Sequence, residues 1–162
     1  MKEFAELYKR VIAFNTKAGV KDEEPFTMEW WKAIDLQTKL SVEEATEGYD
    51  AAQREDITEV LDGCIDSLVI NFKLAQMLEA AGCDVIGAFE AVCGNNDSKV
   101  FSSYYEAVEA KEQLEERDDQ EYSIETAICN GMPFYSVRNY YGKISKPVNF
   151  KGVDLKPFIP RS

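Results

Sequence analysis

The sequence of 162 residues contains no histidine. A Ser–His–Asp triad, a Cys–His pair and a His-ligated zinc site each need an imidazole, so these three kinds of site are excluded. Any acid–base or metal chemistry in this chain must therefore use carboxylates, lysines, tyrosines or a metal-bound water.

Cysteines are few and widely spaced. The four are Cys64, Cys83, Cys93 and Cys129, and no two of them form a C-x-x-C pair. Metal-thiolate and thiol redox motifs therefore have no support in the sequence. We expect reduced and mostly buried thiols, as is usual in a cytosolic protein.

Long hydrophobic runs are also missing. No apolar stretch approaches the roughly 20 residues that a membrane-spanning helix needs. The first ten residues, MKEFAELYKR, are charged and amphipathic, without the apolar segment of a signal peptide. We expect a protein of the cytoplasm that makes no contact with a membrane.

Basic residues are scarce relative to acidic ones. The chain has 18 Lys and Arg against 30 Asp and Glu, which gives a net charge of −12. Such a chain repels nucleic acid, so no direct nucleic-acid binding is expected, and it attracts divalent cations. The length and the 45% of hydrophobic residues fit a single domain over residues 1–162.

The spacing of apolar residues predicts four helices in the first part of the chain. They cover residues 3–14, 28–55 after a cap at Thr27, 56–82 and 84–92. The second helix is expected to be continuous but broken or strained near Ser41. After Gly94 the sequence becomes more polar: residues 102–123 form a highly charged stretch that we expect to be helical. Residues 132–150 carry β-branched and aromatic side chains around Gly142 and are expected to form a small hairpin or an extended arm.

Acidic side chains cluster on the second and third predicted helices. Because a helical residue turns by about 100°, Glu59, Asp62 and Asp66 fall within an arc of about 60°. Glu44 and Glu47 lie three apart and share one face of the preceding helix. Few basic residues stand at the positions that would pair with these acids.

The link between these two helices, residues 54–56, is short, which predicts antiparallel neighbours with both acidic clusters in one place. Converging carboxylates repel and need a counter-ion. All-oxygen ligands suit Mg²⁺ or Mn²⁺, and Mg²⁺ commonly shares its coordination shell with substrate phosphates. The residue types therefore suggest a carboxylate Mg²⁺ site that acts on phosphates.

Three segments of the chain resemble a known family. EATE at Glu44–Glu47 followed by EVLD at Glu59–Asp62 fits an E-x-x-E, spacer, E-x-x-D signature. NNDSK at Asn95–Lys99 is similar to an S-N-M-S-K motif, and YGKISKPVNFKGVDLKPFI is similar to a G-K-x-x-K-x-x-x-F-x-x-x-D-L tail. These motifs resemble those of the all-α nucleoside triphosphate pyrophosphohydrolases, which include MazG proteins, dimeric dUTPases and phosphoribosyl-ATP pyrophosphohydrolases.

The resemblance implies an all-α helical bundle with a small C-terminal extended or hairpin arm at about 133–162. Residues 102–123 would then be an acidic helical insertion. It also implies a homodimer or tetramer, and it is compatible with a phage protein that works in the host cytoplasm. The implied reaction cleaves the bond between the α and β phosphates of a nucleoside triphosphate, giving the monophosphate and pyrophosphate.

Carried over to this chain, the resemblance assigns roles to particular residues. Mg²⁺, or Mn²⁺ in its place, would be held by Glu44, Glu47, Glu59 and Asp62, with Asp66 as a further ligand or a partner of the ligands. Glu43 would orient or deprotonate the attacking water. The nucleotide substrate would be contacted by Asn96, Lys99, Lys143 and Lys146.

Two alternatives stay open from the sequence. The chain could be a non-catalytic acidic protein that mimics DNA and inhibits a nucleic-acid-binding partner. It could also be an enzyme of the same fold that acts on phosphoribosyl-ATP or on an alarmone. Hydrolysis assays on a panel of nucleotides separate these possibilities.

Overall fold

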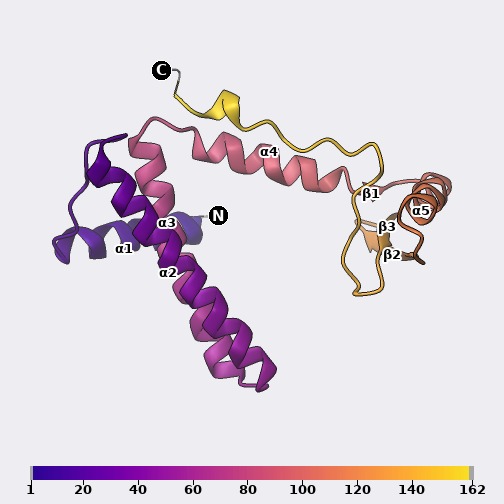
Figure 1. Ribbon diagram of the computed structural model, residues 1–162, viewed down its shortest axis with the longest axis horizontal. Coiled ribbons are helices and arrows are strands. Elements are labelled where there is room, and N and C mark those ends of the chain that lie inside the picture. The colour runs from indigo at the N-terminus through magenta and orange to yellow at the C-terminus, as the bar shows by residue number, and fades with distance from the viewer. Residues whose placement is uncertain (1, 161–162) are drawn as a thin grey trace. The chain divides into compact units, whose positions relative to one another are not determined.

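The computed structural model describes residues 2–160, with side chains from residue 5 onward. Within that range the chain has five α-helices and one three-stranded antiparallel sheet (Figure 1). It divides into two compact units. Residues up to Val85, with residues 158–160, form the first unit, and Ile86–Pro157 forms the second. The expectation of one domain over residues 1–162 stays a prediction.

The first unit contains three long helices, α1 (Lys2–Lys17), α2 (Met28–Gln53) and α3 (Ile57–Ala80). The side chain of Thr27 accepts a hydrogen bond from the Trp30 amide at 3.2 Å, and this cap begins α2 as predicted. The expected break near Ser41 is absent, since α2 continues through it. Asp56, the last residue of the three-residue link, caps α3 by accepting hydrogen bonds from the amides of Thr58 and Glu59.

The core of the first unit lies where the start of α2 meets the end of α3. Trp30, Met77 and Ala81 are buried there, with Ile34 and Leu78 packed against them. Trp30 is only 3% exposed, so it belongs to the core and has no face free to stack on a base.

The second unit combines helix and sheet. Its elements are α4 (Val85–Asp97), β1 (Val100–Phe101), α5 (Tyr104–Asp118), β2 (Ser123–Cys129) and β3 (Met132–Arg138). The first residue of α4 and the last residue of a short 3-10 helix, η1 (Lys156–Phe158), belong to the first unit. The strand order is β1-β3-β2. Helix α5 packs on the sheet through a small core made of Ala110, Leu114, Tyr122 and Val137, with Phe101 and Ile124 beside it.

The all-α fold class is wrong, because the second unit contains this sheet. A tight hairpin joins β2 to β3 through Asn130 and Gly131, both of which have positive φ angles of 51° and 77°. An Asn-Gly pair with this geometry forms a type I′ turn, whose twist matches that of paired strands. The sequence therefore contains a hairpin signal at Asn130–Gly131. The prediction instead centred the hairpin on Gly142 and extended the acidic insertion to residue 123, where β2 begins.

The segment around Gly142 forms a turn instead. The Asn139 amide bonds to the Lys143 carbonyl at 3.1 Å, and the Asn139 side chain accepts hydrogen bonds from the amides of Tyr141 and Lys143. Gly142 takes a positive φ of 75°, which glycine adopts without strain. The chain then returns beside β3, where Ile144 pairs with Arg138.

Among the described residues, no helix has the length and apolar character that crossing a membrane requires. The expectation of mostly buried thiols is wrong, because Cys64, Cys93 and Cys129 are exposed and Cys83 is half-buried.

Candidate carboxylate site

Helices α2 and α3 lie side by side, and glycine sets how closely they approach (Figure 1). A Cβ atom built on Gly63 would lie 3.1 Å from the Gly48 Cα and N atoms and from the Glu44 carbonyl oxygen. That separation is tighter than ordinary van der Waals contact, so a side chain at position 63 would push the helices apart. The two backbones therefore meet within a turn of the predicted acidic ligands.

Four of the predicted acidic residues lie near Glu44, which is half-buried on α2, whereas Glu59 lines the adjacent cavity. Burial raises the pKa of the Glu44 carboxyl above its ordinary value, and neighbouring negative charges raise it further. These charges belong to Glu47, Asp66, Glu43 and Asp62, in decreasing order of effect. Two helices thus contribute carboxylates to one region, as the short 54–56 link predicted.

None of these carboxylates has a basic partner within the part of the chain that the structure describes. The ion pairs there involve other acids, such as Asp35 with Lys39 and Glu6 with Lys9. Unpaired carboxylates close to one another, whose charges raise the pKa of Glu44, form a region of negative potential that attracts cations.

A small cavity opens beside this cluster, at the end of the helix pair where α2 leads into α3. Its volume is about 230 Å³, and it is lined by Glu47, Asp50, Arg54, Glu59, Asp62 and Gly63. Asp50 and Arg54 were not predicted. Both could have been found from helical spacing, because Asp50 follows Glu47 by three positions and Arg54 follows Asp50 by four.

The donor chemistry of this cluster fits a hard divalent cation. All the candidate ligands are carboxylate oxygens, the type that Mg²⁺ and Mn²⁺ prefer. Yet no three acidic or thiol side chains among the described residues stand close enough together to hold a metal ion. Glu43, Glu47, Glu59, Asp62 and Asp66 are exposed, so their side chains can change rotamer. The metal-ligand set stays a prediction.

The predicted substrate-binding residues lie in the second unit, and two of them, Lys99 and Lys146, stand at the ring of Phe150. The Lys99 ammonium donates to the Asn96 side-chain oxygen and stands 5.5 Å from the centre of the Phe150 ring. The Lys146 ammonium lies 5.3 Å from the centre of the same ring. Two cations at one aromatic ring form a local positive group, held by cation–π attraction. Sequence reasoning did not select Phe150.

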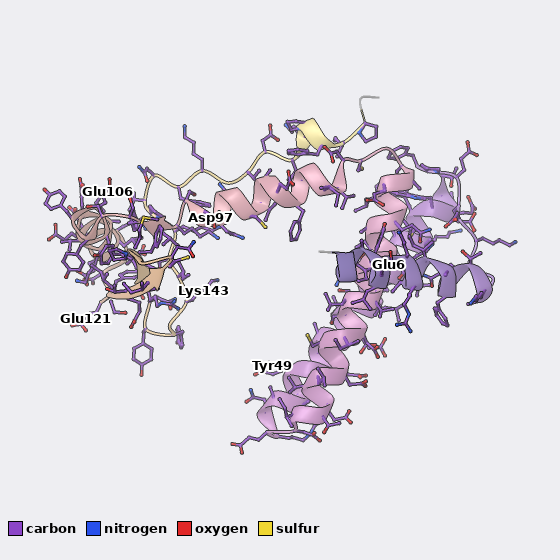
Figure 2. The ribbon with its side chains drawn as sticks, turned by 180° about the vertical axis from the view of Figure 1, so that it is seen from behind. Glu6, Tyr49, Asp97, Glu106, Glu121 and Lys143 are labelled. Carbon is purple, nitrogen blue, oxygen red and sulfur yellow. The ribbon has the colours of Figure 1, made fainter. Side chains whose placement is uncertain are left out.

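Lys143 is separate from this group. It lies in the Asn139–Lys143 turn after β3, with an exposed side chain (Figure 2). The Lys143 amide donates a hydrogen bond to the Asn139 side chain, and this bond stabilises the turn. No described contact joins the Lys143 side chain to Lys99 or Lys146, so their common role in binding phosphate stays a prediction.

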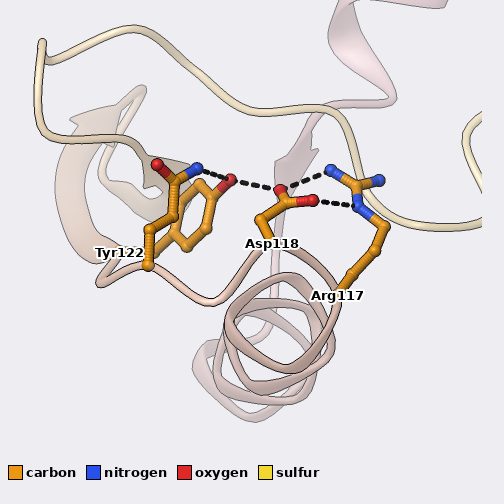
Figure 3. Close-up of polar contacts among 4 residues, drawn as sticks. Arg117, Asp118 and Tyr122 are labelled. Atoms are coloured by element: carbon orange, nitrogen blue, oxygen red, sulfur yellow. Dashed lines mark hydrogen bonds and ion pairs between the residues drawn. The ribbon is translucent and has the colours of Figure 1, made fainter.

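A polar network fastens the end of α5 to the start of β2 (Figure 3). Arg117 donates two hydrogen bonds of 2.6 Å to the Asp118 carboxylate, and the buried Tyr122 hydroxyl donates a third of 2.5 Å. The Arg117 guanidinium, and next the Tyr122 hydroxyl, lower the pKa of Asp118 to about 2. Gln120 donates to the Tyr122 hydroxyl. All the partners are internal, so this network is structural.

Comparisons with known proteins add no assignment, since no protein-family model, curated protein or solved structure matches the chain.

Proposed function

We propose that this protein is a Mg²⁺-dependent nucleoside triphosphate pyrophosphohydrolase of the cytoplasm. It would cleave the bond between the α and β phosphates and release a nucleoside monophosphate and pyrophosphate. The observation that carries the proposal is the gathering of carboxylates from α2 and α3 around Glu44, without a basic partner among the described residues. The E-x-x-E and E-x-x-D spacing of these acids supports the same reading.

In this proposal the carboxylates hold the metal. Glu44 and Glu47 on α2, with Glu59 and Asp62 on α3, would bind Mg²⁺ or Mn²⁺, and Asp66 would be a further ligand or hold the ligands in place. When bound, the ion neutralises charge that develops on the phosphate oxygens. Gly63 supports this role by letting the two sets of ligands approach one another.

Glu43 would act on the water. It is exposed next to Glu44 and is one of the charges that raise the Glu44 pKa, so it belongs to the same cluster. As the water oxygen forms a bond to phosphorus and the bond to the leaving phosphate oxygen breaks, the proton of the water would pass to the Glu43 carboxylate. With no histidine in the chain, a carboxylate is the available base.

Positive side chains of the second unit would contact the nucleotide. Lys99 and Lys146 would meet phosphate oxygens, and their convergence at Phe150 supports an anion-binding role. Asn96, which already accepts a hydrogen bond from Lys99, would orient that lysine or contact the nucleotide directly. Lys143 would contribute from its exposed turn.

The active form would be a homodimer or a tetramer. Large apolar side chains stand exposed along α2 and α3 and support an interface there. Tyr49, which stands out from the helix pair in Figure 2, is 63% exposed. Others are Val42, Ile57, Leu61 and Ile65.

Incubation with a nucleotide panel and Mg²⁺ tests the function. The panel should contain the common ribo- and deoxynucleoside triphosphates, phosphoribosyl-ATP and a tetraphosphate alarmone. We expect pyrophosphate and a monophosphate from at least one nucleoside triphosphate, and no release by Glu47→Gln. Glu6→Gln is the matched control, because Glu6 is an exposed acid that pairs with Lys9 on α1. Hydrolysis of none of these compounds would overturn the proposal and favour an acidic DNA mimic.

A further inference from the structure

Strand β2 is a long free edge of the sheet. It has seven residues and pairs with β3 alone in the order β1-β3-β2. Six of its seven residues are exposed, and none of the described backbone hydrogen bonds outside the sheet involves it. Such an edge presents unpaired N–H and C=O groups that can pair with another strand.

The features that normally protect an edge strand are missing from β2. Its sequence, SIETAIC, contains no proline, no lysine and one charge, Glu125. Its pairing with β3 runs without a bulge from Ser123↔Arg138 to Cys129↔Met132. An unprotected edge of this length favours a pairing partner.

The type I′ turn fixes which backbone groups of β2 face outward. In a two-residue hairpin the closing pair, here Cys129 and Met132, exchanges both hydrogen bonds, and this pattern then alternates along the strands. The N–H and C=O groups of Ile124, Thr126 and Ile128 therefore point to the free edge. Pro133 agrees with this pattern. It stands opposite Ile128 in a pair that exchanges no hydrogen bonds, so the N–H that proline lacks is not needed between β2 and β3.

We propose that β2 pairs with β2 of a second copy of this chain, antiparallel, about a two-fold axis at Thr126. In that register Thr126 lies opposite the partner's Thr126, and Ile124 lies opposite the partner's Ile128. Among antiparallel registers, it alone uses all three outward-facing residues on both strands, which gives six backbone hydrogen bonds. The result would be one continuous sheet of six strands, whose outer edges are the two-residue β1 strands, and the two-fold axis limits the β2 pairing to two copies.

The side chains fit the same register. Ile128 is 69% exposed and would pack beside the partner's Ile124, which already lies against the core under α5. On the other face, Glu125 would stand opposite the partner's Ala127, so the one charge of the strand does not meet itself directly. A second copy is therefore compatible with β2 in both hydrogen bonding and charge.

Disulfide trapping tests the register. Ser123 would face the partner's Cys129 in a pair that exchanges no hydrogen bonds. The Cα atoms of such a pair lie about 4.5 Å apart, a separation that a disulfide can span. The background carries Cys64→Ser and Cys93→Ser, because both thiols are exposed. In it, Ser123→Cys should form a covalent dimer when oxidised glutathione takes up the two electrons and two protons of the thiol pair. Ala127→Cys is the control on the same face, and it should stay monomeric on a non-reducing gel.

Two charge variants test the interface itself by sedimentation. Ile128→Lys places a charge beside the partner's Ile124 and should abolish both the β2 association and the trapping of Ser123→Cys. Ala127→Lys should retain the association, because the new ammonium would face the partner's Glu125. Circular dichroism should show both variants folded, since both sites are exposed.

Equal cross-linking of Ser123→Cys and Ala127→Cys, or trapping unaffected by Ile128→Lys, would overturn the proposal. A dimer formed through α2 and α3, as suggested under the proposed function, would not respond to a substitution at residue 128. Failure of the β2 pairing can therefore be distinguished from failure of the proposed function.

Discussion

Gly63 allows α3 to approach α2 where the two carry their acidic side chains. A methyl group at this position would lie 3.1 Å from Gly48 backbone atoms. We expect Gly63→Ala to lower the free energy of unfolding by about 1–3 kcal/mol, the usual cost of overpacking. Gly48→Ala is the matched control, because a Cβ there meets nothing within 4 Å and alanine favours a helix. Urea unfolding of both variants gives the comparison, and equal stability would contradict this role for Gly63.

Glu44 carries a destabilising charge when no cation is bound. Its pKa is raised in the folded protein, so the ionised form costs stability above that pKa, and the cost disappears at low pH where Glu44 is protonated in both states. Glu44→Gln should therefore raise the melting temperature at pH 7 in EDTA and change it little near pH 3. Thermal unfolding at the two pH values measures this difference. A lower melting temperature at pH 7 would show that Glu44 has a stabilising partner.

Glu43 and Glu47 should respond differently to loss of charge. If Glu43 activates water without holding metal, Glu43→Gln should lower kcat by roughly 10²–10⁴-fold, the range for general acid–base catalysis. The Mg²⁺ affinity of Glu43→Gln should change little. Glu47→Gln should lose both the activity and the Mg²⁺ affinity. Initial rates over a Mg²⁺ titration separate the two effects, and weaker Mg²⁺ binding with an unchanged saturating rate would make Glu43 a ligand.

At the scale of elements, the first three helices were predictable because local signals and packing agree. Apolar spacing predicted α1 and α3, and Thr27 predicted the start of α2. The break expected near Ser41 was wrong. Ser41 followed by Glu44 fits the pattern of a helix start, but the same spacing also occurs inside a continuous helix, as it does in α2.

The β-hairpin was missed for a physical reason that is visible in its residues. Ile124, Thr126 and Ile128 alternate with small or polar residues, and Asn130–Gly131 gives the turn, but the preceding acidic run extended the helical interpretation to residue 123. Residues 102–123, which contain α5, were expected to be an acidic helical insertion. Its Ala107, Ala110 and Leu114 are instead buried, because a narrow stripe of small residues suffices to pack on a short sheet.

The network at the end of α5 should make the second unit sensitive to acid. The folded pKa of Asp118 is about 2 against an ordinary value of 3.8, so its contribution to stability is present above pH 3.8 and is lost as the pH falls toward 2. Asp118→Asn should lower stability at pH 7 and flatten this acid dependence. Acid unfolding followed by Tyr fluorescence checks it. Gln113→Asn is a control on the exposed side of the same helix.

At the scale of the whole molecule, the negative and the positive candidate groups belong to different units of the chain. The carboxylates lie in the first unit, and the lysine group at Phe150 lies in the second. Sequence spacing was enough to gather the acids, because they lie on two helices with a short link. The same spacing could also have identified Asp50 and Arg54, which line the cavity beside the acids. It could not identify Phe150, whose position depends on how the C-terminal segment folds on α4.

We propose that the carboxylates of α2 and α3 support Mg²⁺-dependent cleavage between the α and β phosphates. The most direct measurement is ³¹P NMR of the best substrate during turnover by the wild-type protein and by Glu47→Gln, with and without Mg²⁺. We expect signals of the monophosphate and pyrophosphate from the wild-type protein with Mg²⁺, and unchanged triphosphate in the other three samples. Release of a diphosphate and inorganic phosphate, or full turnover by Glu47→Gln, would contradict it.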